Sequence, residues 1–203
     1  MSTQTSEAHH EPLEYSTEDG RLKIFGFWVF LGAEVVLFGT LFATYLVMFG
    51  RTADGPGPKE MFEVKDLAIE TFLLLTSSFT GGIGVYEMRR GNRKGLLIWL
   101  IITVLLGLGF LSVEIKEFVE YIGEGVGLST SAYWSGFFTL VGTHGAHVSL
   151  GVLWIISIMI QLARRGLNAT TSRKVFIAGL YWHFLDVMWI FIFTLVYLTG
   201  MVM

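Results

Sequence analysis

Five ionisable side chains lie deep inside the apolar stretches of the chain: Glu34, His144, His147, His183 and Asp186. The two histidines of VGTHGAHVSLG are three residues apart, and the same spacing separates His183 from Asp186 in YWHFLDVMWIFIF. Residues at i and i+3 share one face of a helix, so the members of each pair can act together. Ionisable groups in apolar surroundings are costly and usually pair with one another. We therefore expect the five to form a buried polar network that joins the first, fourth and fifth apolar stretches.

Three kinds of chemistry would suit His144 and His147. Imidazole binds copper, iron and zinc, but the chain has no cysteine and no HExxH pattern to complete a metal or haem site. The rings could instead relay protons with Glu34 or Asp186. They could also hydrogen-bond across helices and fix their packing, since nearby glycines allow close approach. The sequence leaves all three open and favours packing, so we predict no catalytic, cofactor-binding or metal-binding residue in this chain.

The composition indicates a membrane protein. Of the 203 residues, 53% are hydrophobic and 15% are charged, against about 25% charged in soluble domains. The formal net charge is only −3, and no basic stripe with interleaved aromatic residues suggests a nucleic-acid partner. Because the chain has no cysteine, it has no disulfide and no thiolate metal site.

Five apolar stretches are long enough to cross a membrane, which takes about 20 residues of helix. They are residues 24–49, 67–87, 95–113, 133–162 and 175–201. A spanning segment must satisfy its own backbone hydrogen bonds. We therefore predict an all-α, polytopic membrane protein in which residues 21–203 form a bundle of five transmembrane helices. Residues 1–20 contain five acidic residues and no Lys or Arg, which predicts a polar acidic tail and not a signal peptide.

Basic residues are unevenly divided between the two ends of the predicted bundle. Ten of the fourteen precede the first span or follow the second and fourth: Arg21, Lys23, Arg89, Arg90, Arg93, Lys94, Arg164, Arg165, Arg173 and Lys174. Cytoplasmic loops carry the excess of Lys and Arg, so we predict a cytoplasmic N-terminus and a C-terminus outside. Glu114 and Glu117 then fall at the outer interface, on a solvated end of the third span.

Several motifs resemble subunit III of the haem–copper terminal oxidases. YWHFLDVMWIFIF followed by YLTG is similar to its C-terminal helix, and GTHGAHVSLG to its His-Gly-x-His segment. FGFWVFLGAEVVLFGTLFATY resembles the family's helix with a buried carboxylate, here Glu34, and GFLSVEIKEF the end of its next-but-one helix. The resemblance covers about residues 21–200, without the extra first helices of mitochondrial-type members. RLKIFGFW, EMRRG and VEIKEF look most like the bacterial quinol oxidase branch.

The resemblance implies a non-catalytic subunit III of a proton-pumping, oxygen-reducing respiratory quinol oxidase in a bacterial cell membrane. It implies that the haems and copper belong to subunit I, which is the main contact, and that subunits II and IV complete the complex. This chain would carry no redox centre. It would stabilise subunit I, bind phospholipid and support sustained turnover.

Three other functions stay open. The nearest is subunit III of a bacterial cytochrome c oxidase, because five-span subunits occur there too. A free-standing membrane haem protein would use His144, His147 or His183 as ligands. A proton-coupled transporter would use Glu34 and Asp186 as carriers, although an odd number of spans cannot divide into two equal inverted halves.

Overall fold

A computed structural model describes residues 12–53 and 56–202, and within them it contains helices and no strand. The long helices are α1 (Glu18–Met48), α3 (Val64–Arg89), α4 (Arg93–Gly123), α5 (Ala132–Arg165) and α6 (Ala169–Ile192). The last is continued by a π-helical segment, η2 (Phe193–Leu198), and by α7 (Thr199–Val202). Two short helices, η1 (Leu13–Tyr15) and α2 (Pro58–Met61), lie in the connections.

The predicted all-α class with five long apolar helices is confirmed. By length and composition, each of α1, α3, α4, α5 and the continuous α6–α7 segment could cross a membrane. The helices extend beyond the predicted apolar stretches, most clearly for α4, which continues to Gly123 where the prediction ended at residue 113. Of the predicted acidic tail, residues 1–11 lie outside the described part, and α1 already begins at Glu18.

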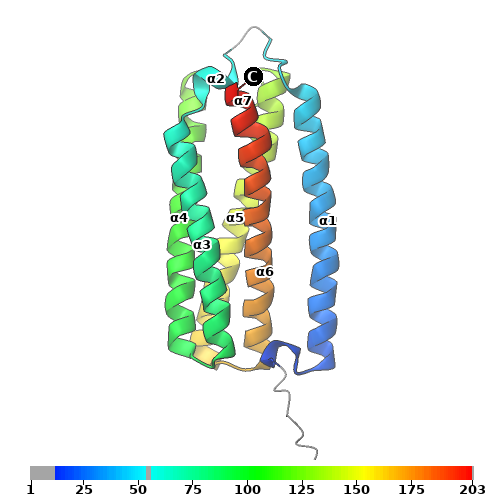
Figure 1. Ribbon diagram of the computed structural model, residues 1–203, viewed down its shortest axis with the longest axis vertical. Helices are drawn as coiled ribbons and strands as arrows, with labels where there is room; N and C mark the ends of the chain where they lie inside the picture. Colours follow the sequence, from blue (N-terminus) through cyan, green and yellow to red (C-terminus); the bar gives the residue numbers. More distant parts are fainter. Residues whose placement is uncertain (1–11, 54–55, 203) are drawn as a thin grey trace, which may run out of the picture.

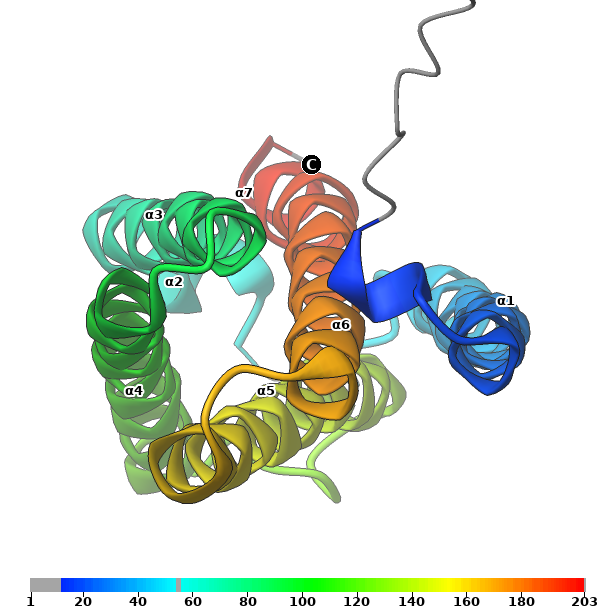
Figure 2. The same ribbon diagram turned by 90° about the horizontal axis from the view of Figure 1, so that it is seen from below.

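Helices α3, α4, α5 and α6 form a four-sided bundle, and α1 lies outside it against α5 and α6 (Figure 2). Only 17% of the most apolar 18-residue stretch of α1 is buried, whereas 39% of the corresponding stretch of the α6–α7 segment is buried. The chain runs alternately up and down, so the start of α1 and the C-terminal end lie at opposite ends of the bundle (Figure 1). The α1 helix is therefore the peripheral element, held through two neighbours.

Polar side chains set the first turns of the long helices. Thr17, Asn92 and Ser131 each accept a hydrogen bond from a backbone N–H in the first turn of α1, α4 and α5. Asn168 begins α6 with a reciprocal capping box that includes Thr171. Such caps satisfy backbone donors that have no partner inside the helix.

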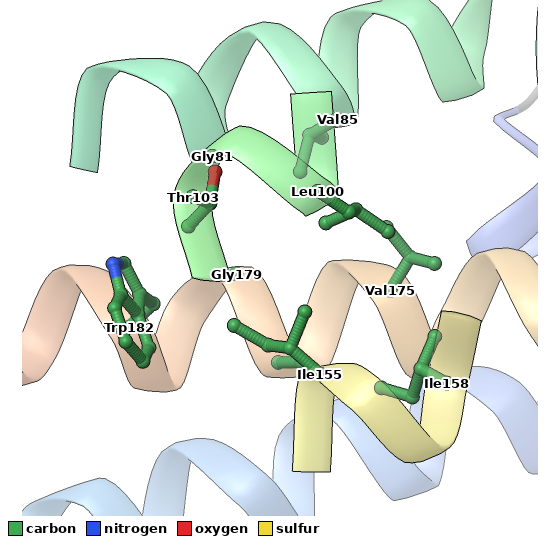
Figure 3. Close-up of a pocket in the computed structure, with 10 residues that line it drawn as sticks. Gly81, Val85, Leu100, Thr103, Ile155, Ile158, Val175, Gly179 and Trp182 are labelled. Carbon is green, nitrogen blue, oxygen red and sulfur yellow. The ribbon is translucent and has the colours of Figure 1, made fainter. Parts of the chain in front are cut away.

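Trp182 of α6 fills the middle of the four-sided bundle. Its ring is 2% exposed, and Nε1 donates to Oγ of Ser77 in α3 at 3.0 Å. A cavity of about 20 Å³ remains beside it, lined mainly by apolar side chains such as Leu100 and Ile155 (Figure 3). The hydroxyl of Thr103, which also lines the cavity, is already hydrogen-bonded to Thr80 at 2.8 Å. The centre of the bundle is therefore packed core and not a ligand site.

Candidate functional site

Glu34 of α1 and His147 of α5 face each other. Oε2 of Glu34 is 3.2 Å from Nε2 of His147, and both side chains are mostly buried. The other ring nitrogen, Nδ1, is 2.7 Å from the carbonyl oxygen of Thr143. A carbonyl only accepts, so Nδ1 carries a proton and donates it there. Nε2 and the Glu34 carboxyl group are therefore in close polar contact between α1 and α5, although Oε2 of Glu34 makes no hydrogen bond of good geometry to the described residues.

His144 is enclosed by aromatic rings. It is fully buried, and neither ring nitrogen has a hydrogen-bond partner among the described residues. Its ring stands perpendicular to Phe110, with centroids 5.8 Å apart, and lies 5.5 Å from Trp189 at an angle of 30°. In this position the imidazole packs as a flat ring between α4, α5 and α6.

His183 and Asp186 lie in a surface groove of about 480 Å³ between α3 and α6. Nδ1 of His183 is 2.6 Å from Oγ of Ser78 in α3. Asp186 is 9% exposed, and its Oδ1 has no hydrogen-bond partner in the described part of the chain. The expectation that His183 is buried needs correction, because its side chain is exposed at the surface of the isolated chain.

The five polar residues do not form one network, because His183 and Asp186 lie on the face of α6 that meets α3, whereas Glu34 and His147 meet between α1 and α5. Tyr181 of α6 faces α5, where its hydroxyl donates to the carbonyl oxygen of His147 at 3.2 Å. His183 follows two residues later, about 200° further around a helix of 3.6 residues per turn, and so faces α3. No hydrogen bond or ion pair among the described residues joins the Glu34–His147 pair to Asp186.

Glu114 and Glu117 of α4 are buried inside the bundle, where we expected a solvated outer interface. Each is 3% exposed, and Glu70 of α3, in the same region, is 0% exposed. Oε2 of Glu117 accepts hydrogen bonds from the hydroxyls of Tyr197, at 3.2 Å, and Tyr121, at 3.5 Å. Both carboxyl oxygens of Glu70 and Oε1 of Glu114 lack a hydrogen-bond partner among the described residues.

The burial of these carboxyl groups depends on a glycine and on the length of α4. A Cβ added to Gly145 of α5 would lie 2.5 Å from Oε2 of Glu114, so glycine leaves room for that carboxyl group in its present position. The buried face of α4 repeats every three or four residues: Leu96, Leu100, Thr103, Gly107, Phe110, Glu114, Glu117 and Tyr121. This spacing is visible in the sequence and would have placed both glutamates on the inner face.

The sequence reasoning also missed a polar pocket beyond this cluster, near the end of α4. Lys116 donates to Oδ2 of Asp66 in α3 at 2.9 Å, and the two lie beside a cavity of about 350 Å³. Glu117 and Tyr121 line the same cavity, so it reaches from the buried cluster to the end of the bundle. Within the described residues, no group of three or more His, Asp or Glu is placed to hold a metal ion.

A family profile described as Cytochrome c oxidase subunit III matches residues 8–201, almost the whole chain. The chain belongs to this family. The resemblance read from the sequence motifs is thereby confirmed. Glu34 and His147 lie within two of the motifs that carried the resemblance, whereas Ser78, Glu70 and Asp66 lie on α3 outside its quoted motif, EMRRG, which covers the end of that helix.

Individual relatives match over nearly their full length. Quinol oxidase subunit 3 of Bacillus subtilis (strain 168) is 64% identical over 190 residues, which cover 94% of this chain and 93% of that protein. Probable quinol oxidase subunit 3 of Staphylococcus saprophyticus is 56% identical over 191 residues, covering 94% and 95%. Cytochrome c oxidase subunit 3 of Bacillus sp. (strain PS3) is 52% identical over 191 residues, covering 94% and 92%.

Proposed function

We propose that the chain is subunit 3 of a bacterial quinol oxidase, an oxygen-reducing, proton-pumping complex of the cell membrane. The observation that carries this proposal is the 64% identity to quinol oxidase subunit 3, over 94% of the chain. The second candidate is subunit 3 of a cytochrome c oxidase, favoured by the relative at 52% identity over a similar length. In either complex the chain is a non-catalytic subunit.

The geometry of the polar groups supports a structural role. Each of three polar contacts connects a different pair of helices: Glu34 with His147, Ser78 with His183, and Tyr197 with Glu117. Interhelical hydrogen bonds and close packing hold helices together in lipid, where apolar surface alone gives no preference for protein over lipid. The chain therefore acts as a rigid helical subunit that stabilises the catalytic subunit within the membrane.

The haems and copper belong to subunit I, which is the main partner. Subunits II and IV complete the complex, and phospholipid is bound at its edges.

The N-terminus is cytoplasmic and the C-terminus lies outside. This orientation is supported by the basic residues at one end of the bundle, where α1, α4 and α6 begin (Figure 1). Arg89, Arg93, Arg165 and Arg173 belong to this set. Basic residues beside spanning helices favour the cytoplasmic side.

Purification of the complex through an affinity tag on this chain tests the proposed function. The membranes of the source bacterium would be solubilised in mild detergent, and oxygen consumption would be measured with quinol and, separately, with reduced cytochrome c. We expect quinol-driven oxygen consumption and a co-purifying large subunit that carries haem and copper. Oxygen consumption with cytochrome c alone would favour the second candidate, and recovery of the chain without an oxidase would overturn both.

A further inference from the structure

The groove between α3 and α6 has a polar centre at the middle of the bundle. Ser78 is fourteen residues from the first residue of α3, about 21 Å at 1.5 Å per residue. His183 is fourteen residues from the first residue of the α6–α7 segment, so it lies at a similar depth. Phe79 and Leu75 line the groove around this centre. In the middle of a bilayer, neither water nor lipid headgroups supply hydrogen bonds to such groups.

The polar atoms of the groove are short of hydrogen-bond donors. Ser78 interacts with both His183 and Asp186, but its hydroxyl has one proton. If that proton goes to the Asp186 carboxylate, Nδ1 of His183 donates to Ser78, and Nε2 is left as an acceptor. Oδ1 of Asp186 is a second acceptor without a partner among the described residues. The groove therefore presents at least one acceptor, Oδ1 of Asp186, to its surroundings.

The outward face of α4 lacks such polar groups. Its exposed side chains at similar depth include Ile101, Leu105 and Leu108. The nearest exposed hydroxyl, that of Ser112, donates to the carbonyl oxygen of Leu108 in its own helix. Acyl chains can cover this face at no polar cost, whereas they offer no donor to Asp186.

We propose that the groove between α3 and α6 is the surface through which this chain docks against a membrane-spanning helix of another oxidase subunit. That helix places a hydrogen-bond donor, such as a guanidinium, amide, hydroxyl or indole N–H group, beside Asp186 and His183. Gly82 leaves space next to the His183 ring, since a Cβ added there would approach Nε2 to 3.9 Å. The inference rests on the proposed function, which supplies the partner subunits, and adds which face of this chain meets them.

Site-specific photo-crosslinking in the assembled complex tests this surface. Phe79 of the groove is 69% exposed and Leu105 of α4 is 61% exposed, so they are matched in exposure and depth. Each would be replaced, in separate strains, by p-benzoylphenylalanine, and crosslinked peptides would be identified by mass spectrometry after irradiation of the membranes. We expect Phe79 to crosslink to a membrane-spanning peptide of another oxidase subunit, and Leu105 to yield lipid adducts only. Crosslinks from Phe79 to lipid only, or to a second copy of this chain, would overturn the proposal.

Substitution of the acceptor gives an independent measurement. With an affinity tag on the large subunit, the amount of this chain retained after detergent purification would be compared for Asp186→Leu, Asp186→Asn and the control Leu105→Ala. We expect at least a several-fold loss for Asp186→Leu, a smaller loss for Asp186→Asn, which keeps an acceptor oxygen, and none for the control. Equal chain levels in the membranes before extraction would show that each variant folds. Full retention of Asp186→Leu would contradict the docking surface while leaving the proposed function intact, whereas failure of the unsubstituted chain to co-purify would contradict the proposed function itself.

Discussion

Glu34 and His147 meet at 3.2 Å between α1 and α5, each with little access to the surface. Nδ1 of His147 already donates to the carbonyl oxygen of Thr143, so Nε2 is the ring nitrogen that faces Glu34. Removing one member of such a pair leaves the other as a buried polar group without a partner, while replacing both by apolar groups can be nearly neutral. Substitutions at Glu34 can therefore distinguish the effect of the polar contact on stability from the effect of side-chain size.

We expect Glu34→Gln to leave assembly and the initial rate of oxygen reduction largely intact, since its amide N–H can donate to Nε2 of His147. Glu34→Leu leaves the imidazole unpaired, at a cost of about 1–3 kcal/mol. That loss should appear as weaker attachment of the chain or faster inactivation during turnover, measured as oxygen consumption over time beside subunit content. The double variant Glu34→Leu with His147→Leu should recover much of the stability. Loss of oxygen reduction from the first turnover in Glu34→Gln, with all subunits present, would place Glu34 in the proton path and contradict the structural role.

Tyr197 provides a second test at the level of single residues. Its hydroxyl donates to the buried carboxyl group of Glu117 at 3.2 Å, and only the longer bond from Tyr121, at 3.5 Å, would remain in Tyr197→Phe. We expect a loss of about 1–3 kcal/mol in the stability of the complex, because a buried acceptor loses its better donor. Thermal inactivation of the purified complex measures this loss. Tyr15→Phe, at a tyrosine of η1 whose ring packs edge-on against Phe176, is the control, and equal inactivation of the two variants would disprove the importance of this contact.

At the scale of the elements, three helices bring glycines to the ring of Trp182 in α6. A Cβ added to Gly107 of α4 would lie 2.8 Å from the ring, one added to Gly151 of α5 would lie 3.0 Å away, and one added to Gly81 of α3 would lie 3.9 Å away. The ring cannot retreat, because it is buried and its Nε1 is hydrogen-bonded to Ser77. The helices thus approach closely where a large ring meets two small residues.

We expect Gly107→Ala to destabilise the chain by about 1–3 kcal/mol, the usual cost of forcing extra volume into a packed core. Gly81→Ala should change stability much less, because 3.9 Å is an ordinary van der Waals distance. Both variants add the same methyl group to a long helix, so their difference reports the clash with Trp182. The readout is the temperature at which the chain is lost from the purified complex, and a Gly81→Ala effect as large as that of Gly107→Ala would exclude this explanation.

The number and helical nature of the elements could be predicted from the sequence, because apolar length alone decides them. Their ends could not, since α4 carries Glu114 and Glu117 inside the bundle, where a hydropathy criterion stops. The polar contacts between helices were even harder to predict from the sequence. Spacing within α6 correctly paired His183 with Asp186 on one face, but which helix that face meets depends on packing, and the partner was Ser78.

At the scale of the whole molecule, an odd number of spanning helices puts the start of the first helix and the end of the last on opposite sides of the membrane. The starts of α1, α4 and α6 share one end with the last residues of α3 and α5, and the C-terminal end lies at the other (Figure 1). The ten-to-four division of basic residues follows the same partition. One orientation of the bundle therefore places all of its strongly basic connections on the same side of the membrane. This topology can be tested at two points of the chain.

We predict that a reporter fused after Met203 lies outside the cell and one fused after Arg165 lies in the cytoplasm. The reason is that Arg164, Arg165, Arg173 and Lys174 flank the short connection between α5 and α6, where positive charge holds a loop on the cytoplasmic side. Alkaline phosphatase, which is active only outside, should be active in the first fusion and silent in the second. Green fluorescent protein fused at the same two positions should give the reverse pattern, with fluorescence from the Arg165 fusion and none from the Met203 fusion. Phosphatase activity from the Arg165 fusion, with none from the Met203 fusion, would contradict the predicted topology. It would show that the bundle has the opposite orientation, with its basic end on the outer face.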